Sequence, residues 1–338
     1  MAEKFNKVKY KNDFIRENYD RLNIFVQKGV KDELRKYASR QNSSMNEVVN
    51  SMLMKRLAKS RKLSIRILME DTDAKEGCCA EHGLSVYVQT PKHDVLLDTG
   101  ATAKFMQNAE QLGIDLREVD TVVLSHGHYD HSGGITELAK LNKKAIIYMQ
   151  KSAMDDFYHG ERYIGTDKAV GELSQVIKIE GERVIDDELS IFSGIKGRRF
   201  MPKSNIGLSK RVDGKDVQDE FEHEQCLVIR TLKGNVLLSG CAHNGILNVL
   251  DRYRELYRDE PIMVISGFHM MKKSEYSEDE RAIIEETARE LAKMNTVFYT
   301  GHCTGKAAYE IMKPIMGEKL QPIHSGVAIE LKYVEEEK

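Results

Sequence analysis

Four side chains of the kind that bind metal ions are concentrated in SHGHYDHSGG, residues 125–134, directly after the apolar run VDTVVL. Imidazole and carboxylate groups are the usual protein ligands of zinc and similar ions. Residues two apart point the same way in an extended segment, so His126 and His128 can chelate one ion. Asp130 and His131 can turn toward a second position, because the neighbouring glycines let the backbone bend. The alternative is a polar surface loop, but a full ligand set favours two metals at the end of a strand.

The chain has 338 residues, enough for two domains, and its 41% hydrophobic content is sufficient for a large buried core. No apolar run approaches the roughly 18 residues that a membrane-spanning helix requires. The charged N-terminus does not contain the apolar segment of a secretory signal. The cysteines show neither CxxC spacing nor the density of a disulfide scaffold, which is typical of a reduced, cytoplasmic protein. They are Cys78, Cys79, Cys226, Cys241 and Cys303.

The charge is distributed unevenly along the chain. The first 62 residues hold 16 Lys and Arg against 7 Asp and Glu, a charge of +9, and the remainder carries −11. Such a division indicates a small basic module joined to an acidic body. We expect a flexible basic arm at 1–18, a small domain at 19–60 and a large domain at 63–338. The basic part could contact a polyanion, or it could be a solvated extension.

The small domain has its own pattern. Apolar and polar residues alternate in RLNIFVQ, residues 21–27, which predicts a strand with one apolar face. Helical spacing begins at Val30, and SMNE, residues 44–47, predicts a capping box that opens a second helix. One strand and two helices cannot bury their own apolar faces. We therefore expect a homodimer in which this strand pairs with the same strand of a second chain.

This pattern resembles the ribbon-helix-helix family of dimeric DNA-binding domains. The resemblance implies that the paired strands enter the major groove of duplex DNA, with Arg21, Asn23 and Phe25 facing the bases. It also implies that Ser44 and the amides after it hold a phosphate at the start of the second helix. Phe25 departs from the polar residue that the family pattern carries. The alternative is a dimerisation module that binds no DNA.

Beyond the linker, strands alternate with helices in two rough halves, as in two sheets with helices packed outside. Strands are predicted at 63–70, 83–90, 93–100, 119–125, 144–150, 261–267, 295–301 and 326–333, and a hairpin at 224–240. Helices are predicted at 101–112, 244–257, 277–294 and 305–316. Residues 155–200 have no clear periodicity and are expected to form short strands and loops.

The ligand stretch resembles the metallo-β-lactamase superfamily over roughly residues 63–338. The resemblance implies a mixed α/β (α+β) fold, an αββα sandwich with metals at one edge, here preceded by the small ribbon-helix-helix domain. It implies that His126 and His128 hold one ion with a later histidine, and that Asp130 and His131 hold a second ion with another. Asp98, from LLDTG, would support the ligand loop from behind. Two divalent ions are expected, Zn²⁺ first, with iron or manganese as alternatives.

The later ligands are less clearly marked. His243, in VLLSGCAHNG, is the preferred third ligand of the first ion, and His223 is the alternative. His302, in YTGHCTG, is preferred for the second ion, and His269, in GFHM, competes with it. Cys241 stands where relatives carry a bridging aspartate, so its role is open.

The set EHGLS, LLDTG, SHGHYDHSGG, GCAHNG, GFH and GHCTG is similar to a narrower branch of the superfamily. That branch takes its name from 7,8-dihydropterin-6-yl-methyl-4-(β-D-ribofuranosyl)aminobenzene 5′-phosphate synthase. The resemblance implies a reaction that joins a pterin diphosphate to an arylamine with loss of pyrophosphate. Glu81 and His82 are expected to line the substrate cleft.

Two functions follow from the sequence. The first is a metallo-hydrolase, or a synthase-like enzyme, acting on a small-molecule substrate, in which Asp130 binds metal and orients the nucleophile or accepts a proton. The second is a DNA-binding transcriptional regulator whose large domain senses a metabolite or a metal. The complete ligand set favours the enzyme.

Overall fold

The computed structural model describes residues 23–40, 43–60, 63–72 and 75–330. The chain divides into two compact units, and the boundary falls between Lys59 and Ser60. None of the helices in these described ranges has the length and apolar character needed to cross a lipid bilayer.

The N-terminal unit contains the helices α2 (Val30–Arg40) and α3 (Met45–Ser60). The predicted capping box is present at the start of α3. The Ser44 backbone N–H donates to the Glu47 carboxylate over 2.7 Å, and the Glu47 N–H donates to the Ser44 hydroxyl over 3.2 Å. This reciprocal pair satisfies two backbone donors that the first helical turn leaves without partners, and it fixes where α3 begins.

The predicted strand is not formed in the single chain. Residues 23–27 have no strand assignment, and Ile24, Phe25 and Val26 are 54%, 106% and 47% exposed. A strand needs backbone partners on a neighbouring strand, and the described residues of this unit, 23–40 and 43–59, include no such strand. The expected arm at 1–18 and residue Arg21 lie outside the described residues.

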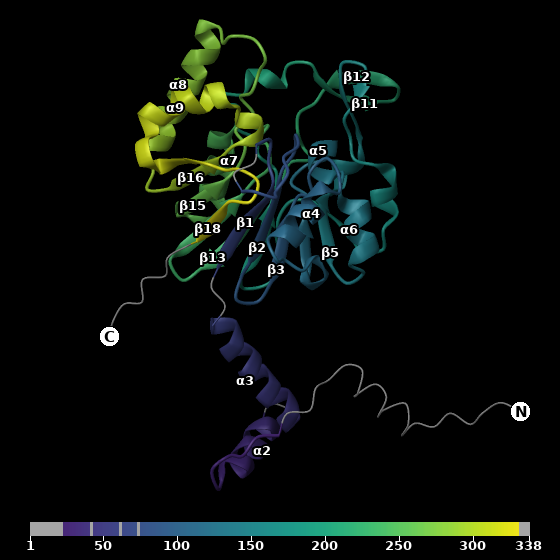
Figure 1. The fold of residues 1–338 in the computed structure, drawn as a ribbon, viewed down its shortest axis with the longest axis vertical. Coiled ribbons are helices and arrows are strands. Elements are labelled where there is room, and N and C mark those ends of the chain that lie inside the picture. The colour runs from purple at the N-terminus through teal and green to yellow at the C-terminus, as the bar shows by residue number, and fades with distance from the viewer. Residues whose placement is uncertain (1–22, 41–42, 61–62, 73–74, 331–338) are drawn as a thin grey trace, which may run out of the picture. The chain divides into compact units, whose positions relative to one another are not determined.

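The C-terminal unit is built on two seven-stranded sheets, ordered β18-β1-β2-β3-β4-β5-β8 and β17-β16-β15-β14-β13-β10-β9 (Figure 1). The first sheet comprises β1 (Ser64–Met69), β2 (Ser85–Gln89), β3 (Asp94–Leu97), β4 (Thr121–Val123), β5 (Ile146–Gln150), β8 (Val176–Ile179) and β18 (Ala328–Glu330). The second comprises β9 (Arg183–Val184), β10 (Leu189–Phe192), β13 (Cys226–Thr231), β14 (Gly234–Leu238), β15 (Met263–Ile265), β16 (Val297–Thr300) and β17 (Leu320–Pro322).

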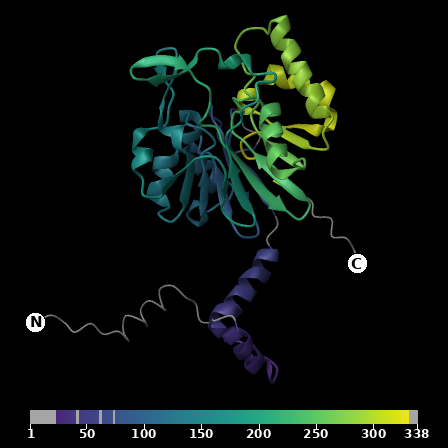
Figure 2. The same cartoon turned by 180° about the vertical axis from the view of Figure 1, so that it is seen from behind.

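Helices cover the outer face of each sheet (Figures 1 and 2). They are α4 (Lys104–Gln111), α6 (Ile135–Leu141), α7 (Ile246–Tyr257), α8 (Glu278–Ala292) and α9 (Lys306–Met316). The one-turn helix α5 (Tyr129–Ser132) lies within the ligand stretch that follows β4. Short 3-10 helices lie at Leu116–Glu118, Lys151–Met154, Lys168–Glu172, Lys203–Asn205, His302–Thr304 and Gly317–Lys319.

Three apolar clusters fill the spaces between four layers, which are two layers of helices and two sheets. One cluster, with Ile65 and Leu227 among its members, lies between the two sheets. A second joins the first sheet to α4 and α6 through residues such as Phe105, and a third joins the second sheet to α7, α8 and α9 through residues such as Tyr253. The predicted αββα sandwich is confirmed. Burial of these large side chains is the main contribution to its stability.

A small third sheet was not foreseen. It has the order β12-β11-β6-β7 and consists of β6 (Asp156–His159), β7 (Arg162–Tyr163), β11 (Leu208–Val212) and β12 (Lys215–Gln218). Phe157, Ile164, Leu208 and Phe221 form an apolar cluster beneath it. The Phe157 ring lies edge-on to a histidine of the ligand stretch, at 5.6 Å between ring centroids. This sheet therefore borders the region where the predicted ligands gather.

Candidate metal centre

The predicted ligands follow the carboxyl ends of strands. Asp98 follows β3, His126 to His131 follow β4, Cys241 and His243 follow β14, His269 follows β15, and His302 follows β16. Strands β3 and β4 are parallel, and so are β14, β15 and β16. Parallel neighbours end at the same edge of a sheet, and the two sheets pack face to face. The side chains from both halves of the unit therefore meet at one edge.

The first group of ligands gathers around His126. The Nε2 atoms of His126 and His243 are 3.3 Å apart, and Cys241 Sγ lies within 4.8 Å of ligand atoms of both. The ring of His128 is 4.7 Å from that of His126, and its buried Nε2 has no hydrogen-bond partner in the part of the chain that the structure describes. Burial lowers the pKa of His128 to about 3 and that of His126 well below its ordinary value. These imidazoles are therefore neutral, the form that binds metal.

The second group contains Asp130, His131, Cys241 and His302, whose ligand atoms all lie within 4.8 Å of one another. Burial alone would lower the pKa of His302, but hydrogen bonds with Asp130 and Asp71 raise it well above its ordinary value. His131 and His302 in turn keep the pKa of the Asp130 carboxyl below its usual range, against the effect of burial. The Asp130 carboxylate therefore stays ionised beside these rings, and a bound cation could take the place of the proton on His302.

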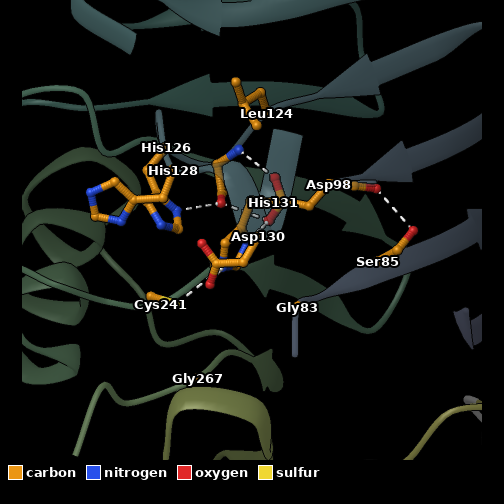
Figure 3. A network of polar contacts seen from close by, with 12 residues as sticks. Gly83, Ser85, Asp98, Leu124, His126, His128, Asp130, His131, Cys241 and Gly267 are labelled. Carbon is orange, nitrogen blue, oxygen red and sulfur yellow. Dashed lines mark hydrogen bonds and ion pairs between the residues drawn. The ribbon is translucent and has the colours of Figure 1, made fainter. Parts of the chain in front are cut away.

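Supporting groups contact the ligand rings from behind, and Figure 3 shows one of them, Asp98, beside His131. The Asp98 carboxylate lies 2.7 Å from His131 Nδ1, and it accepts the backbone N–H of Ser125 over 2.7 Å and the Ser125 hydroxyl over 2.6 Å. Asp71 lies 2.6 Å from His302 Nδ1, and Asn205 Oδ1 lies 3.1 Å from His243 Nδ1. Contacts of this kind set the tautomer, so that the other ring nitrogen keeps its lone pair for a metal.

Sequence reasoning found Asp98 but missed Asp71 and Asn205. Asp71 had a usable signal, because it follows the apolar strand β1 in the same way as Asp98 follows β3. Asn205 lies in a short 3-10 helix outside the regular sheets, and no local pattern connects it with His243.

The structure separates the competing late histidines. His223 uses both ring nitrogens, since Nδ1 accepts the Gly127 N–H over 2.9 Å and Nε2 lies 3.0 Å from an Asp219 carboxylate oxygen. It thus braces the ligand loop, whereas the Nε2 of His243 lies 3.3 Å from the Nε2 of His126, another candidate ligand. His302 joins Asp130 and His131, whereas His269 gathers with Cys241 and Cys303.

His82 and Glu81 occupy different environments. The His82 side chain is 46% exposed, and its Nε2 lies 3.6 Å from Asp130 Oδ2, at the open side of the second group. A hydrogen bond with Asp71 raises the pKa of His82. Glu81 instead accepts the Thr102 N–H over 2.9 Å and the Thr102 hydroxyl over 2.8 Å. Its carboxylate therefore holds the turn before α4, and of the two residues only His82 is seen beside the ligands.

The predicted DNA contacts lie in the N-terminal unit. Asn23, Phe25 and Ser44 are exposed there. The Glu47 carboxylate occupies the backbone N–H of Ser44, and hydrogen bonds with Ser44 and Ser43 keep the pKa of Glu47 low. A negative charge already sits where a phosphate was expected, which opposes phosphate binding at that position.

The donor set matches the chemistry of a metal site. Imidazoles, a carboxylate and a thiol converge at one sheet edge, and the buried Nε2 of His128, in the same ligand stretch, has no hydrogen-bond partner among the described residues. Comparison with known proteins agrees. A family model described as the Metallo-beta-lactamase superfamily matches residues 80–285, and the chain belongs to that superfamily.

Two individual proteins and one solved structure are similar to this chain over most of their own length. The 7,8-dihydropterin-6-methyl-4-(beta-D-ribofuranosyl)-aminobenzene-5′-phosphate synthase of Methanocaldococcus jannaschii is 29% identical over 272 residues, which cover 74% of this chain and 90% of the relative. An uncharacterized protein of the same organism is 30% identical over 218 residues, 62% of this chain and 81% of that protein. The crystal structure of Tm1679, described as a metal-dependent hydrolase of the beta-lactamase superfamily, is 33% identical. It has a TM-score of 0.69 and covers 80% of this chain and 99% of its own.

Proposed function

We propose that this chain is a hydrolase that uses two divalent metal ions, with Zn²⁺ as the first candidate. His126, His128 and His243 would hold one ion, and Asp130, His131 and His302 would hold the other. The observation that carries this function is the convergence of two buried ligand groups, with Cys241 within reach of both. Tm1679, a metal-dependent hydrolase by description, supports the same reaction class.

Bound divalent ions supply a Lewis acid and lower the pKa of water from about 16 to about 7, so that hydroxide is present at neutral pH. The chain supplies the positioning. The Asp130 carboxylate stays ionised because His131 and His302 lower its pKa, so it accepts hydrogen bonds and orients the nucleophile. His82 lies on the exposed side of Asp130, where its ring can hold a proton close to an entering substrate. The substrate class we propose is an ester, lactone, amide or phosphoester.

A synthase-like transfer is the second candidate, and the observation that favours it is the similarity to the Methanocaldococcus jannaschii synthase over 90% of that protein. In this version the same ligand groups would bind a pterin diphosphate, and an arylamine would displace pyrophosphate without attack by water. Incubation with a pterin diphosphate, with and without an arylamine, separates the two. Pyrophosphate release that requires the arylamine supports the synthase, and release without it supports the hydrolase.

Metal content of the full-length protein, measured by elemental analysis, tests the centre. We expect about two ions per chain in the wild type and about one or fewer in Asp130→Ala, because that substitution removes an anionic ligand. Hydrolysis of a chromogenic phosphodiester should fall at least about 100-fold in the same variant. Asp187→Ala is the control, since that side chain is 76% exposed and pairs with Lys92. Unchanged metal content and turnover in Asp130→Ala would contradict the role of Asp130 as a metal ligand.

We also propose that the N-terminal unit pairs with a second copy through residues 23–27. The exposed apolar side chains of Ile24 and Val26 and the basic charge of the first 62 residues support this proposal. Binding of the paired units to duplex DNA is a further expectation, and Asn23 and Phe25 are the described residues that would meet the bases.

A further inference from the structure

We propose that Cys241, His269 and Cys303 form a third metal position, which binds a thiophilic divalent ion such as Zn²⁺ or Cd²⁺ beside the two-metal centre. This third position depends on the proposed function in one respect, namely that two other ions are bound next to it. Its own ligand set is separate, apart from the shared sulfur of Cys241.

Three strand ends bring these donors together. Cys241 follows β14, His269 follows β15 and Cys303 follows β16, and these strands are parallel neighbours. One ligand atom from each of the three residues lies within 4.8 Å of the others. Ligand atoms around one tetrahedral ion, with metal–ligand bonds of about 2.0–2.3 Å, are separated by about 3.5–4 Å. Small side-chain adjustments therefore suffice to close the site around an ion.

Cys303 is packed into this position by its surroundings. Its side chain is buried, and the thiol lies 3.7 Å from the Cys241 carbonyl oxygen. A Cβ at Gly267 would come within 2.4 Å of Cys303 Sγ, so only glycine at 267 leaves room for the sulfur. The backbone of β15 thus accommodates the thiol beside Cys241.

His269 supplies an independent indication of a missing ligand. Both of its ring nitrogens are shielded from solvent and lack a hydrogen-bond partner among the described residues. A buried polar group without a partner destabilises the fold, so native structures rarely leave one unexplained. The backbone of His269 has φ +49°, a strained conformation for a residue other than glycine, and the Ser204 hydroxyl donates to its carbonyl oxygen. Strain of this kind is maintained where the direction of a side chain matters.

The chemistry of the set selects the ion. Two thiolates are soft ligands and an imidazole is a borderline one, and such a set favours Zn²⁺ and Cd²⁺ over Mg²⁺ or Ca²⁺. On binding, any proton that the two sulfurs carry passes to solvent as the sulfur–metal bonds form, and no electron is transferred. Three protein ligands leave a fourth tetrahedral position open, as in zinc sites that bind water or substrate. Cys241 also lies within reach of the other two groups, so its sulfur would bridge the third ion to the centre.

Cadmium titration of the full-length protein tests this position, because sulfur–cadmium bonds absorb in the near ultraviolet. We expect about three ions per wild-type chain, and about two in both Cys303→Ser and His269→Asn. The charge-transfer absorption should fall by about half in Cys303→Ser, which loses one of two thiolates. Cys79→Ser is the matched control, since a serine keeps the hydrogen bond to Asn108 that Cys79 makes over 3.4 Å. Circular dichroism of each variant verifies that it is folded.

The outcomes separate this position from the two-metal centre. A wild type that binds about two ions, with neither stoichiometry nor absorption changed in Cys303→Ser and His269→Asn, overturns the third position and leaves the proposed pair intact. A wild type that binds about one ion, lost in Cys303→Ser and retained in Asp130→Ala, supports the third position and contradicts the pair.

Discussion

At the scale of single residues, the Asp98 carboxylate determines how His131 is presented. It binds His131 Nδ1 and also accepts two hydrogen bonds from Ser125. Asp98→Asn preserves the shape of the side chain but replaces one acceptor oxygen with an NH₂ group. This NH₂ group would face the Ser125 and His131 groups that donate hydrogen bonds to Asp98. We expect the affinity for the second ion to fall about 10–100-fold, as for other residues that orient metal ligands. Competition with a chromophoric chelator measures this affinity. Asp94→Asn, at the other end of β3, is the control, and equal losses in both variants would rule out a specific role for Asp98.

His93 provides a pH-dependent contribution to stability far from the ligands. Its ring lies 2.9 Å from Asp120 and 3.0 Å from Asp186. Burial alone would lower its pKa, but the two carboxylates raise it from 6.5 to about 9. The folded-state pKa exceeds the unfolded one, so the stabilisation is complete below about pH 6.5 and is lost as the pH rises through about 9.

His93→Gln should therefore lower the free energy of unfolding by on the order of 1–2 kcal/mol at about pH 6, and by much less at about pH 9.5. The figure is smaller than the full pKa shift implies, because the partner carboxylates are partly exposed to solvent. Urea unfolding of wild type and variant at both pH values measures the difference. A loss of equal size at the two pH values would show that His93 stabilises the fold by packing rather than by its charge.

At the scale of elements, strong local patterns decided what could be predicted. Strands β1 to β5 and the hairpin of β13 and β14 lie within the predicted ranges, because each is a short apolar run bounded by turn residues. The ligand stretch was placed correctly after β4, since a strand and a glycine-rich turn are both local signals. Helix α8 begins at the capping box of Ser277 and Glu280, inside the predicted range 277–294.

The small sheet and the supporting residues depend on contacts between distant parts of the chain. Strand β6 pairs with β11, about 50 residues later, and both contain polar residues without a clear period. Phe157 and Phe221 become neighbours in one cluster only after the sheet has formed. The different environments of His243 and His223 have the same origin, because Asp219 and Gly127 contact both nitrogens of His223. No single stretch of sequence contains that information.

The join between α5 and α6 positions the ligand stretch against the loop before α4. Gly133 donates its N–H to Gly100 O over 3.0 Å, and a Cβ at this position would lie 2.0 Å from the Ala101 carbonyl oxygen. We expect Gly133→Ala to destabilise the fold by about 2–4 kcal/mol, because a backbone atom must move. Thermal and urea unfolding measure this. Gly171→Ala, where the nearest atom is the flexible end of Met154 at 3.2 Å, should change stability by less than about 1 kcal/mol. Equal stability of the two variants would contradict the tight packing at Gly133.

At the scale of the whole molecule, the chain is larger than a metallo-β-lactamase-fold unit alone. Tm1679 is covered over 99% of its length, yet it accounts for only 80% of this chain. The first 62 residues also carry a charge of +9, against −11 for the remainder. A basic addition to an acidic metallo-β-lactamase-fold unit suggests a role in assembly or in contact with a polyanion. Assembly is the simpler of the two, because Ile24 and Val26 expose apolar surface that pairing would bury.

Dimerisation through residues 23–27 can be tested by light scattering on the full-length protein. The chain mass is 38.6 kDa, so we expect the wild type to have about twice this mass at micromolar concentration. Ile24→Asp places a charge on the apolar face of the ribbon and should yield the mass of a single chain, because burying an unpaired charge is costly. Asn23→Asp adds the same charge to the opposite, polar face and should remain dimeric. A monomeric wild type, or a dimer that survives Ile24→Asp, would refute pairing through this segment.

Binding to duplex DNA can be tested with the same variant, once light scattering has shown that Ile24→Asp is a monomer. We expect the wild type to bind DNA with an affinity that falls as the salt concentration rises, and we expect the variant to lose this binding. That result would tie DNA contact to the pairing of residues 23–27.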